Sequence, residues 1–169
     1  MKTITKLTLF VALLLVCGST YAQKFGYINS QELIMLMPER DSALTKFTQS
    51  QKEYSDMLEM VGVEYQTKLD DLNKNLSTMT DAVKQLREKE LNDLATRYQE
   101  LEQQANQQLS QLQQELMAPV LEKAVNAIKK VGKDNGFTIV FDQAVGATIY
   151  IDDACVNILP LVKTELGIK

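Results

Sequence analysis

The side chains that could carry out chemistry are few in this chain and lie apart from one another. The sequence has no histidine, no glycine-rich phosphate-binding pattern and no Cys-x-x-Cys pair. The neighbouring carboxylates Asp152 and Asp153 follow an expected strand, where such a pair could hold a metal ion or act in acid–base catalysis. Because aspartate is a common turn former, the pattern favours a turn before the last helix. We expect no catalytic residue, no metal site, no cofactor and no enzymatic activity.

The remaining carboxylates are mostly spread along a helical repeat, where they are expected to form a solvated face. Without residues 1–22, the chain has 16 Lys and Arg (18 minus Lys2 and Lys6) and 22 Asp and Glu, so its net charge is −6. Nucleic acids and anionic lipids both bind clustered positive charge. The acidic balance therefore argues against either as a main partner.

The first 22 residues have the features of a secretory signal peptide. Two lysines precede an apolar run from Leu7 to Val16, and a small-residue cleavage pattern ends at Ala22. Ten apolar residues are too few to span a bilayer as a helix. We expect cleavage after Ala22 and a secreted protein without stable membrane insertion. Lipid attachment at Cys17 is the alternative, although the preceding valine fits such a signal poorly.

The middle of the chain, from about Glu39 to Met117, repeats apolar residues every three or four positions. This spacing predicts the apolar seam of a coiled coil. A cluster of cap and turn formers at residues 73–81 interrupts the repeat, and Pro38 and Pro119 lie about equally far from that point. We expect two antiparallel helices joined near residues 78–79, each about forty residues and roughly 60 Å long.

Short segments rich in β-branched and aromatic residues flank this repeat. They are Lys24–Ile28 before it, and Thr138–Phe141 and Ala147–Ile151 after it. All three are expected to be strands, with residues 142–146 as a hairpin turn between the last two. The segment Pro160–Leu166, which a glycine follows, fits a short terminal helix.

These expectations divide the chain into a signal peptide at residues 1–22, a β-rich body at 23–38 plus 120–169, and a helical arm at 39–119. The fold class is α+β, with a long antiparallel coiled-coil hairpin inserted into a small body. A three-stranded sheet of this size is marginal on its own. We therefore expect several chains to combine their strands in one shared β-core.

This arrangement resembles the Skp (OmpH-like) family of periplasmic chaperones. The residues that carry the resemblance are Phe25–Ser30, Gly136–Asp142, Ile149–Asp152 and Leu161–Ile168. The order of signal, strand, long hairpin, strand pair and short helix carries the match more than any single motif. The resemblance implies a periplasmic homotrimer with a β-barrel body and three coiled-coil arms, which hold unfolded outer-membrane proteins without nucleotide.

The function expected from this resemblance is that of an ATP-independent holdase, which binds unfolded outer-membrane β-barrel proteins and prevents their aggregation. The alternative is a structural coiled-coil envelope protein without chaperone activity. Eight glutamines in residues 99–114, together with methionines and tyrosines, provide adaptable contact surface and favour the chaperone. The candidate residues for the shared core are Phe25, Tyr27, Ile139, Phe141, Ile149 and Ile151. The candidate client contacts are Met57, Met60, Tyr65, Leu76 and Met79.

Overall fold

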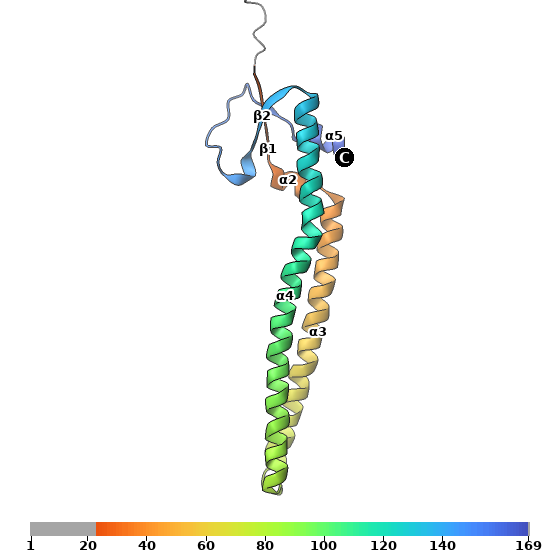
Figure 1. The fold of residues 1–169 in the computed structure, drawn as a ribbon, viewed down its shortest axis with the longest axis vertical. Helices are drawn as coiled ribbons and strands as arrows, with labels where there is room; N and C mark the ends of the chain where they lie inside the picture. The colour runs from red at the N-terminus through yellow and green to blue at the C-terminus, as the bar shows by residue number, and fades with distance from the viewer. Residues whose placement is uncertain (1–22, 169) are drawn as a thin grey trace, which may run out of the picture. The chain divides into compact units, whose positions relative to one another are not determined.

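The computed structural model describes residues 23–168, so the expected signal peptide lies outside the described residues. The described residues form two compact units, one comprising residues 23–31 with 126–168 and the other residues 32–125. Figure 1 labels the elements. In chain order they are β1 (Lys24–Ile28), α2 (Ser30–Met35), α3 (Pro38–Asn75), α4 (Asp81–Asp134), β2 (Phe137–Asp142), the 3₁₀ turn η1 (Gln143–Val145), β3 (Val156–Asn157) and α5 (Leu159–Leu166).

The unit of residues 32–125 is a pair of antiparallel helices, α3 and α4, which confirms the predicted hairpin (Figure 1). Pro38 lies in the first turn of α3, where its fixed φ suits a helix start and its missing N–H costs nothing. The chain reverses over residues 76–80, close to the predicted tip, and the N–H groups of Thr78 and Met79 donate to the carbonyl of Asn75. Pro119 lies inside α4, which continues past it to Asp134.

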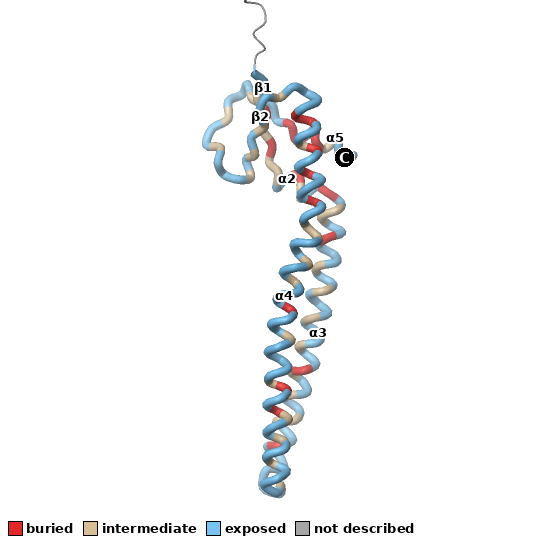
Figure 2. The backbone as a smooth tube through the Cα atoms, viewed as in Figure 1, coloured by how far each residue is buried: buried red, intermediate tan, exposed pale blue. Residues whose placement is uncertain are grey.

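A narrow apolar seam holds the two helices together. Figure 2 shows buried positions only at intervals along α3 and α4, among mostly exposed ones. Val61 and Leu72 of α3 are buried, as are Leu91, Leu94 and Ala105 of α4. Each such side chain contributes roughly 1.5–3 kcal/mol when fully buried, and less for alanine, so a single seam stabilises the pair only moderately.

Ion pairs between α3 and α4 fix the register in which the two helices pack. The ammonium of Lys68 in α3 lies 3.0 Å from the carboxylate of Glu90 in α4, and Lys123 of α4 pairs with Glu39 of α3. The same Glu90 carboxylate accepts from Arg87 at 3.0 Å. These two cations hold the pKa of Glu90 below its usual value, Lys68 more than Arg87. Because the pairs join opposite ends of the hairpin, a shift in register would break both.

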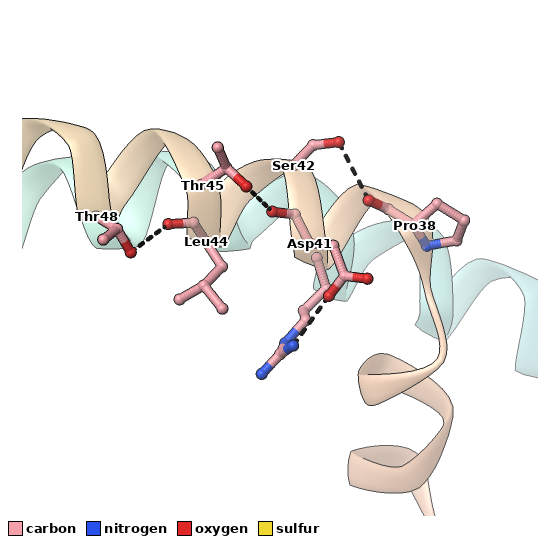
Figure 3. A network of polar contacts seen from close by, with 7 residues as sticks. Pro38, Asp41, Ser42, Leu44, Thr45 and Thr48 are labelled. Atoms are coloured by element: carbon pink, nitrogen blue, oxygen red, sulfur yellow. Dashed lines mark hydrogen bonds and ion pairs between the residues drawn. The ribbon is translucent and has the colours of Figure 1, made fainter.

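The start of α3 satisfies its own hydroxyl groups (Figure 3). The hydroxyl of Ser42 donates to the carbonyl of Pro38, and Thr45 and Thr48 donate to the carbonyls of Asp41 and Leu44, at 2.9–3.2 Å. Such bonds to the carbonyl four residues earlier are a common use of Ser and Thr inside helices. These hydroxyls therefore add little free hydrogen-bonding capacity to the helix surface.

The unit of residues 23–31 with 126–168 contains a three-stranded sheet in the order β2-β1-β3, and both outer strands run parallel to β1. A bulge between β1 and β2 leaves Thr138 without a partner, so that Phe137 pairs with Lys24 and Ile139 pairs with Phe25. The predicted strands Lys24–Ile28 and Thr138–Phe141 are thereby confirmed.

The predicted β-hairpin is wrong. Residues 147–151 are not a strand, and β2 ends in the turn η1, where the Asp142 carboxylate accepts from the N–H of Ala144 at 3.0 Å. The same carboxylate accepts from the N–H and hydroxyl of Ser30, at 3.1 and 2.5 Å. These bonds direct the chain away from β2 at the point where a hairpin would have to return. The third strand is instead the short β3, on the far edge of β1.

Helices cover one face of this sheet. Gly26 and Ile28 of β1 are buried there, and a Cβ atom added to Gly26 would lie 3.0 Å from both Ile158 and Phe137. Gly132 near the end of α4 approaches Val140 of β2, with room for a Cβ at 3.6 Å. The last helix, α5, ends as predicted, with the following glycine in the left-handed conformation. The close approach at Gly26 is what only glycine allows.

Candidate functional site

The Asp152–Asp153 pair is part of a turn, as the sequence analysis favoured. The carboxylate of Asp152 accepts from the N–H of Ala154 at 2.9 Å and from the hydroxyl of Tyr150 at 3.0 Å. These two donors, the N–H first, hold the pKa of Asp152 below its usual value. Within residues 23–168, no group of three or more His, Cys, Asp or Glu side chains is arranged to hold a metal ion.

One candidate surface is the uncovered face of the sheet. Register pairs Phe25 with Ile139 and Tyr27 with Phe141, and alternation along a strand places these four on the face opposite Gly26 and Ile28. We call these four residues the open sheet face. The rings of Phe25 and Phe141 lie 6.4 Å apart at their centroids, tilted by 40°. Ile139 is 47 % exposed and Phe141 is 39 % exposed, which is unusual for apolar strand residues.

The structure brings together four of the six candidates for a shared core and leaves two elsewhere. Ile149 lies in the segment between η1 and β3 and is fully exposed, while Ile151 in the same segment is half-buried. The bulge also matters here, because it turns Phe137 to the covered face. There the ammonium of Lys24 lies 4.2 Å from the centre of the Phe137 ring. The open sheet face is therefore built from two strands only.

The edge of the open sheet face is tied to the start of α2 by Asp142. Burial works to raise the pKa of this carboxyl group, but the hydrogen bonds from Ser30 and Ala144 outweigh it, so the pKa lies below its usual value. One ionised carboxylate thus caps α2, through Ser30, and η1, through Ala144. Its negative charge therefore links the end of β2 to the first residue of α2.

A second candidate surface lies midway along the helix pair. There α3 and α4 leave a hollow of about 310 Å³, which we call the methionine groove. Its least exposed lining residues are Val61 and Leu101, and its remaining lining consists of Met57, Met60, Glu64, Arg97, Glu100 and Gln104. The methionines are unusually open for apolar residues, because Met60 is 71 % exposed and Met57 is 42 % exposed.

A second hollow of about 290 Å³, the tyrosine hollow, lies at the same level of the helix pair and is lined by Gly62, Tyr65, Leu94, Ala95, Tyr98 and Gln99. The small residues Gly62 and Ala95 leave the space that forms this hollow. A Cβ atom added to Gly62 would approach only the ring of Tyr98, at 4.0 Å. The two helices are therefore loosely packed at this level, with Val61 and Leu94 as their buried contacts.

The predicted client contacts fall into three places. Met57 and Met60 line the methionine groove, and Tyr65 lines the tyrosine hollow. Leu76 and Met79 lie in the turn between α3 and α4, where Leu76 is exposed and Met79 is half-buried. The structure therefore gathers three of the five midway along the helix pair.

Sequence reasoning missed the charged lining of the methionine groove. Glu64 follows Met60 by four residues, and Arg97, Glu100 and Gln104 follow one another by three or four. Residues with this spacing share one face of a helix. Extending the apolar positions Met60 and Leu101 by one helical turn would have found Glu64, Arg97 and Gln104, but not Glu100.

No helix within residues 23–168 is long and apolar enough to cross a membrane. Comparison with known proteins identifies relatives that span most of the chain. The family model of the outer membrane proteins called OmpH-like matches residues 24–166. Chaperone protein Skp of Vibrio cholerae serotype O1 is 28 % identical over 124 residues, which cover 73 % of each chain. Chaperone protein Skp of Photorhabdus laumondii is 23 % identical over 154 residues, covering 90 % of this chain and 93 % of the relative.

The fold also matches that of a solved structure. The crystal structure of an OmpH-like protein from Caulobacter crescentus CB15 superposes with a TM-score of 0.73, at 13 % sequence identity, over 88 % of this chain and 86 % of the other. At that identity the likeness concerns the fold alone. The family model, by contrast, spans the sheet, the helix pair and the last helix from the first strand onward. On that match, this chain belongs to the OmpH-like family of outer membrane proteins.

Proposed function

We propose that this protein is an ATP-independent chaperone of the periplasm, which binds unfolded outer-membrane β-barrel proteins and prevents their aggregation. The observation that carries the proposal is the exposed apolar surface of the helix pair. Met57, Met60, Val63, Leu76 and Leu86 are each between 42 % and 71 % exposed. Apolar side chains left in water in such numbers mark a surface that contacts other polypeptides. The relatives named chaperone protein Skp support the same function.

The shape of this surface suits clients without a fixed structure. The methionine groove and the tyrosine hollow have volumes of only about 310 and 290 Å³, so each holds only a small part of a client. Unfolded barrel strands alternate apolar and polar residues and offer only a weak apolar stripe. Many weak contacts made at once give avidity without tight individual binding, which also permits release.

The open sheet face supports assembly into a homotrimer. Four large apolar side chains on a small sheet need cover that residues 23–168 of a single chain do not provide, and burying their remaining exposed area is favourable by roughly 25 cal/mol per Å². A core shared between chains provides this cover. The trimer would carry three helix pairs, and we propose that the β-rich body of residues 23–38 plus 120–169 and the arm of residues 39–119 work as separate parts.

The test is suppression of aggregation. An outer-membrane barrel protein is diluted from urea into buffer with the purified protein and without nucleotide, and light scattering is recorded. We expect suppression near one trimer per client, and only modest weakening by salt, because screening leaves apolar burial intact. Mass in solution, with and without client, is measured in parallel. A protein that forms an oligomer but suppresses no aggregation under any condition would instead be a structural coiled-coil protein.

A further inference from the structure

The middle of the helix pair is more acidic than either end. Residues 50–66 of α3 and 93–104 of α4 contain seven acidic and two basic residues, a net charge of −5. Residues 67–92, around the turn, contain five of each and are neutral. Residues 38–49 and 105–125, at the other end, have a net charge of −1. All nine charged side chains of the middle segment are exposed, so their field acts on the surrounding solvent.

The methionine groove lies inside this acidic segment and contributes part of its charge. Among the residues that the structure describes, the side chains of Glu64, Arg97 and Glu100 form no hydrogen bond or ion pair, although all three line the groove. Their charged groups are therefore available to a ligand. This contrasts with the turn region, where Glu90 already holds Lys68 and Arg87.

We propose that the methionine groove binds extended segments of unfolded polypeptide in which an apolar side chain has a lysine or arginine two residues away. This inference rests on the proposed chaperone function and adds which client segments the arm prefers. The apolar side chain contacts Met57 and Met60, whose flexible thioethers adapt to different shapes. The cationic side chain pairs with Glu64 or Glu100. Arg97, which has five N–H donors, binds backbone carbonyl groups of the segment.

The spacing of side chains along α3 supports this pairing. Met60 and Glu64 are one helical turn apart, which places their Cβ atoms about 5–6 Å from each other. In an extended segment, residues two positions apart lie on the same face, about 6.5–7 Å apart. An apolar residue opposite Met60 therefore brings the residue two positions away close to Glu64. The lining of the tyrosine hollow contains no carboxylate, so this hollow is not expected to prefer segments with a lysine or arginine.

The test uses two fluorescein-labelled peptides that differ only in sign of charge. Each has a central leucine, flanked two residues away on both sides by lysine in one peptide and by glutamate in the other. Binding to the full-length protein is measured by fluorescence anisotropy. We expect the lysine peptide to bind about fivefold tighter at low salt, as two exposed ion pairs provide. The difference should largely disappear near 1 M salt, where the Debye length is about 3 Å.

Matched variants separate the groove from the overall charge. The double variant Glu64→Gln/Glu100→Gln should weaken binding of the lysine peptide about fivefold and leave the glutamate peptide no weaker. The control variant Glu88→Gln/Glu122→Gln removes the same charge at two exposed positions outside the middle segment, and should leave both affinities within twofold. Met60→Gln should weaken both peptides, because it removes apolar contact without changing charge.

Equal affinity for the two peptides at low salt would overturn the inference. So would an equal loss of affinity for the lysine peptide in the two double variants. A third contrary result is that the Glu64→Gln/Glu100→Gln variant keeps its peptide affinity but forms a larger oligomer. The last would mean that a second copy of the chain occupies the groove. A protein that prevents barrel-protein aggregation but does not discriminate the peptides refutes the groove assignment alone. A protein that does neither refutes the proposed function as well.

Discussion

The substitution Ile139→Asp tests whether the open sheet face is a shared core, because the two possibilities predict costs of very different size. In a single chain, Ile139 is 47 % exposed. Placing a polar residue on such a half-open strand position costs about 1 kcal/mol at most. In a shared core the same change removes roughly 1.5–3 kcal/mol of apolar burial and places an unpaired carboxylate in an apolar site, which costs several kcal/mol more.

A trimer would carry this cost three times, against a total stability of about 5–15 kcal/mol for an ordinary domain. We therefore expect Ile139→Asp to abolish the oligomer and to unfold the sheet with it, and Phe141→Asp to do the same. Thr138→Asp is the matched control, since this neighbouring residue is exposed and lies in the bulge. Its oligomer and urea midpoint should stay close to those of the unmodified protein.

Light scattering coupled to size-exclusion chromatography gives the mass, and circular dichroism during urea titration gives the stability of each variant. The helix pair dominates the far-ultraviolet signal, so the near-ultraviolet signal, to which Phe25, Tyr27 and Phe141 of the sheet contribute, is recorded as well. Folded monomers for both Ile139→Asp and Phe141→Asp, with midpoints like that of Thr138→Asp, would refute the shared core.

Three further changes address the arm, a charged cap and a close approach. Replacing residues 45–112 with a short Gly-rich connection should leave a folded oligomer that no longer suppresses aggregation, because the ends of a hairpin already lie together; loss of the oligomer by sedimentation would contradict this. Asp142→Ala should lower the free energy of unfolding by roughly 1–2 kcal/mol near neutral pH. Since the folded-state pKa of Asp142 is lowered, its contribution is present above the unfolded pKa and is lost as pH falls through the folded value, so variant and parent should converge in acid. Gly26→Ala should lower the free energy of unfolding by about 1–3 kcal/mol, because its Cβ would lie 3.0 Å from two side chains. Gly132→Ala, whose Cβ would lie 3.6 Å from the nearest side chain and inside a helix, should be neutral or stabilising. Equal urea midpoints for the two variants would show that the side chains around Gly26 move aside at no cost.

The parts of the fold that the sequence predicted are those with strong local signals. The apolar repeat and Pro38 located α3, the polar cluster at 73–81 located the turn, and the final glycine located the end of α5. The segment 147–151 was wrongly expected to be a strand, because β-branched and aromatic residues report a preference for extended backbone but not the presence of a partner strand. The short β3 carries only two residues and gave no pattern to detect.

For the functional surfaces, composition was more informative than spacing. Met57 and Met60 were predicted from composition, because their flexible thioethers suit adaptable contact, and both line the methionine groove. Glu64, Arg97 and Glu100 look like any solvated charge until the partner helix is in place. The side of the sheet on which Phe137 lies could not be predicted either, because a bulge reverses the alternation and leaves no mark in the sequence.

The strand order has a consequence for how the chain reaches its native state. The central strand β1 is the first described element, and both of its partners follow the helix pair, so that Lys24 meets Phe137 across more than a hundred residues. The helix pair, in contrast, joins Lys68 to Glu90 across 22. Contacts near in sequence form quickly, and distant ones must first close a long loop. The helix pair should therefore form first and wait for the sheet, so that a newly made chain exposes the methionine groove before its sheet has formed.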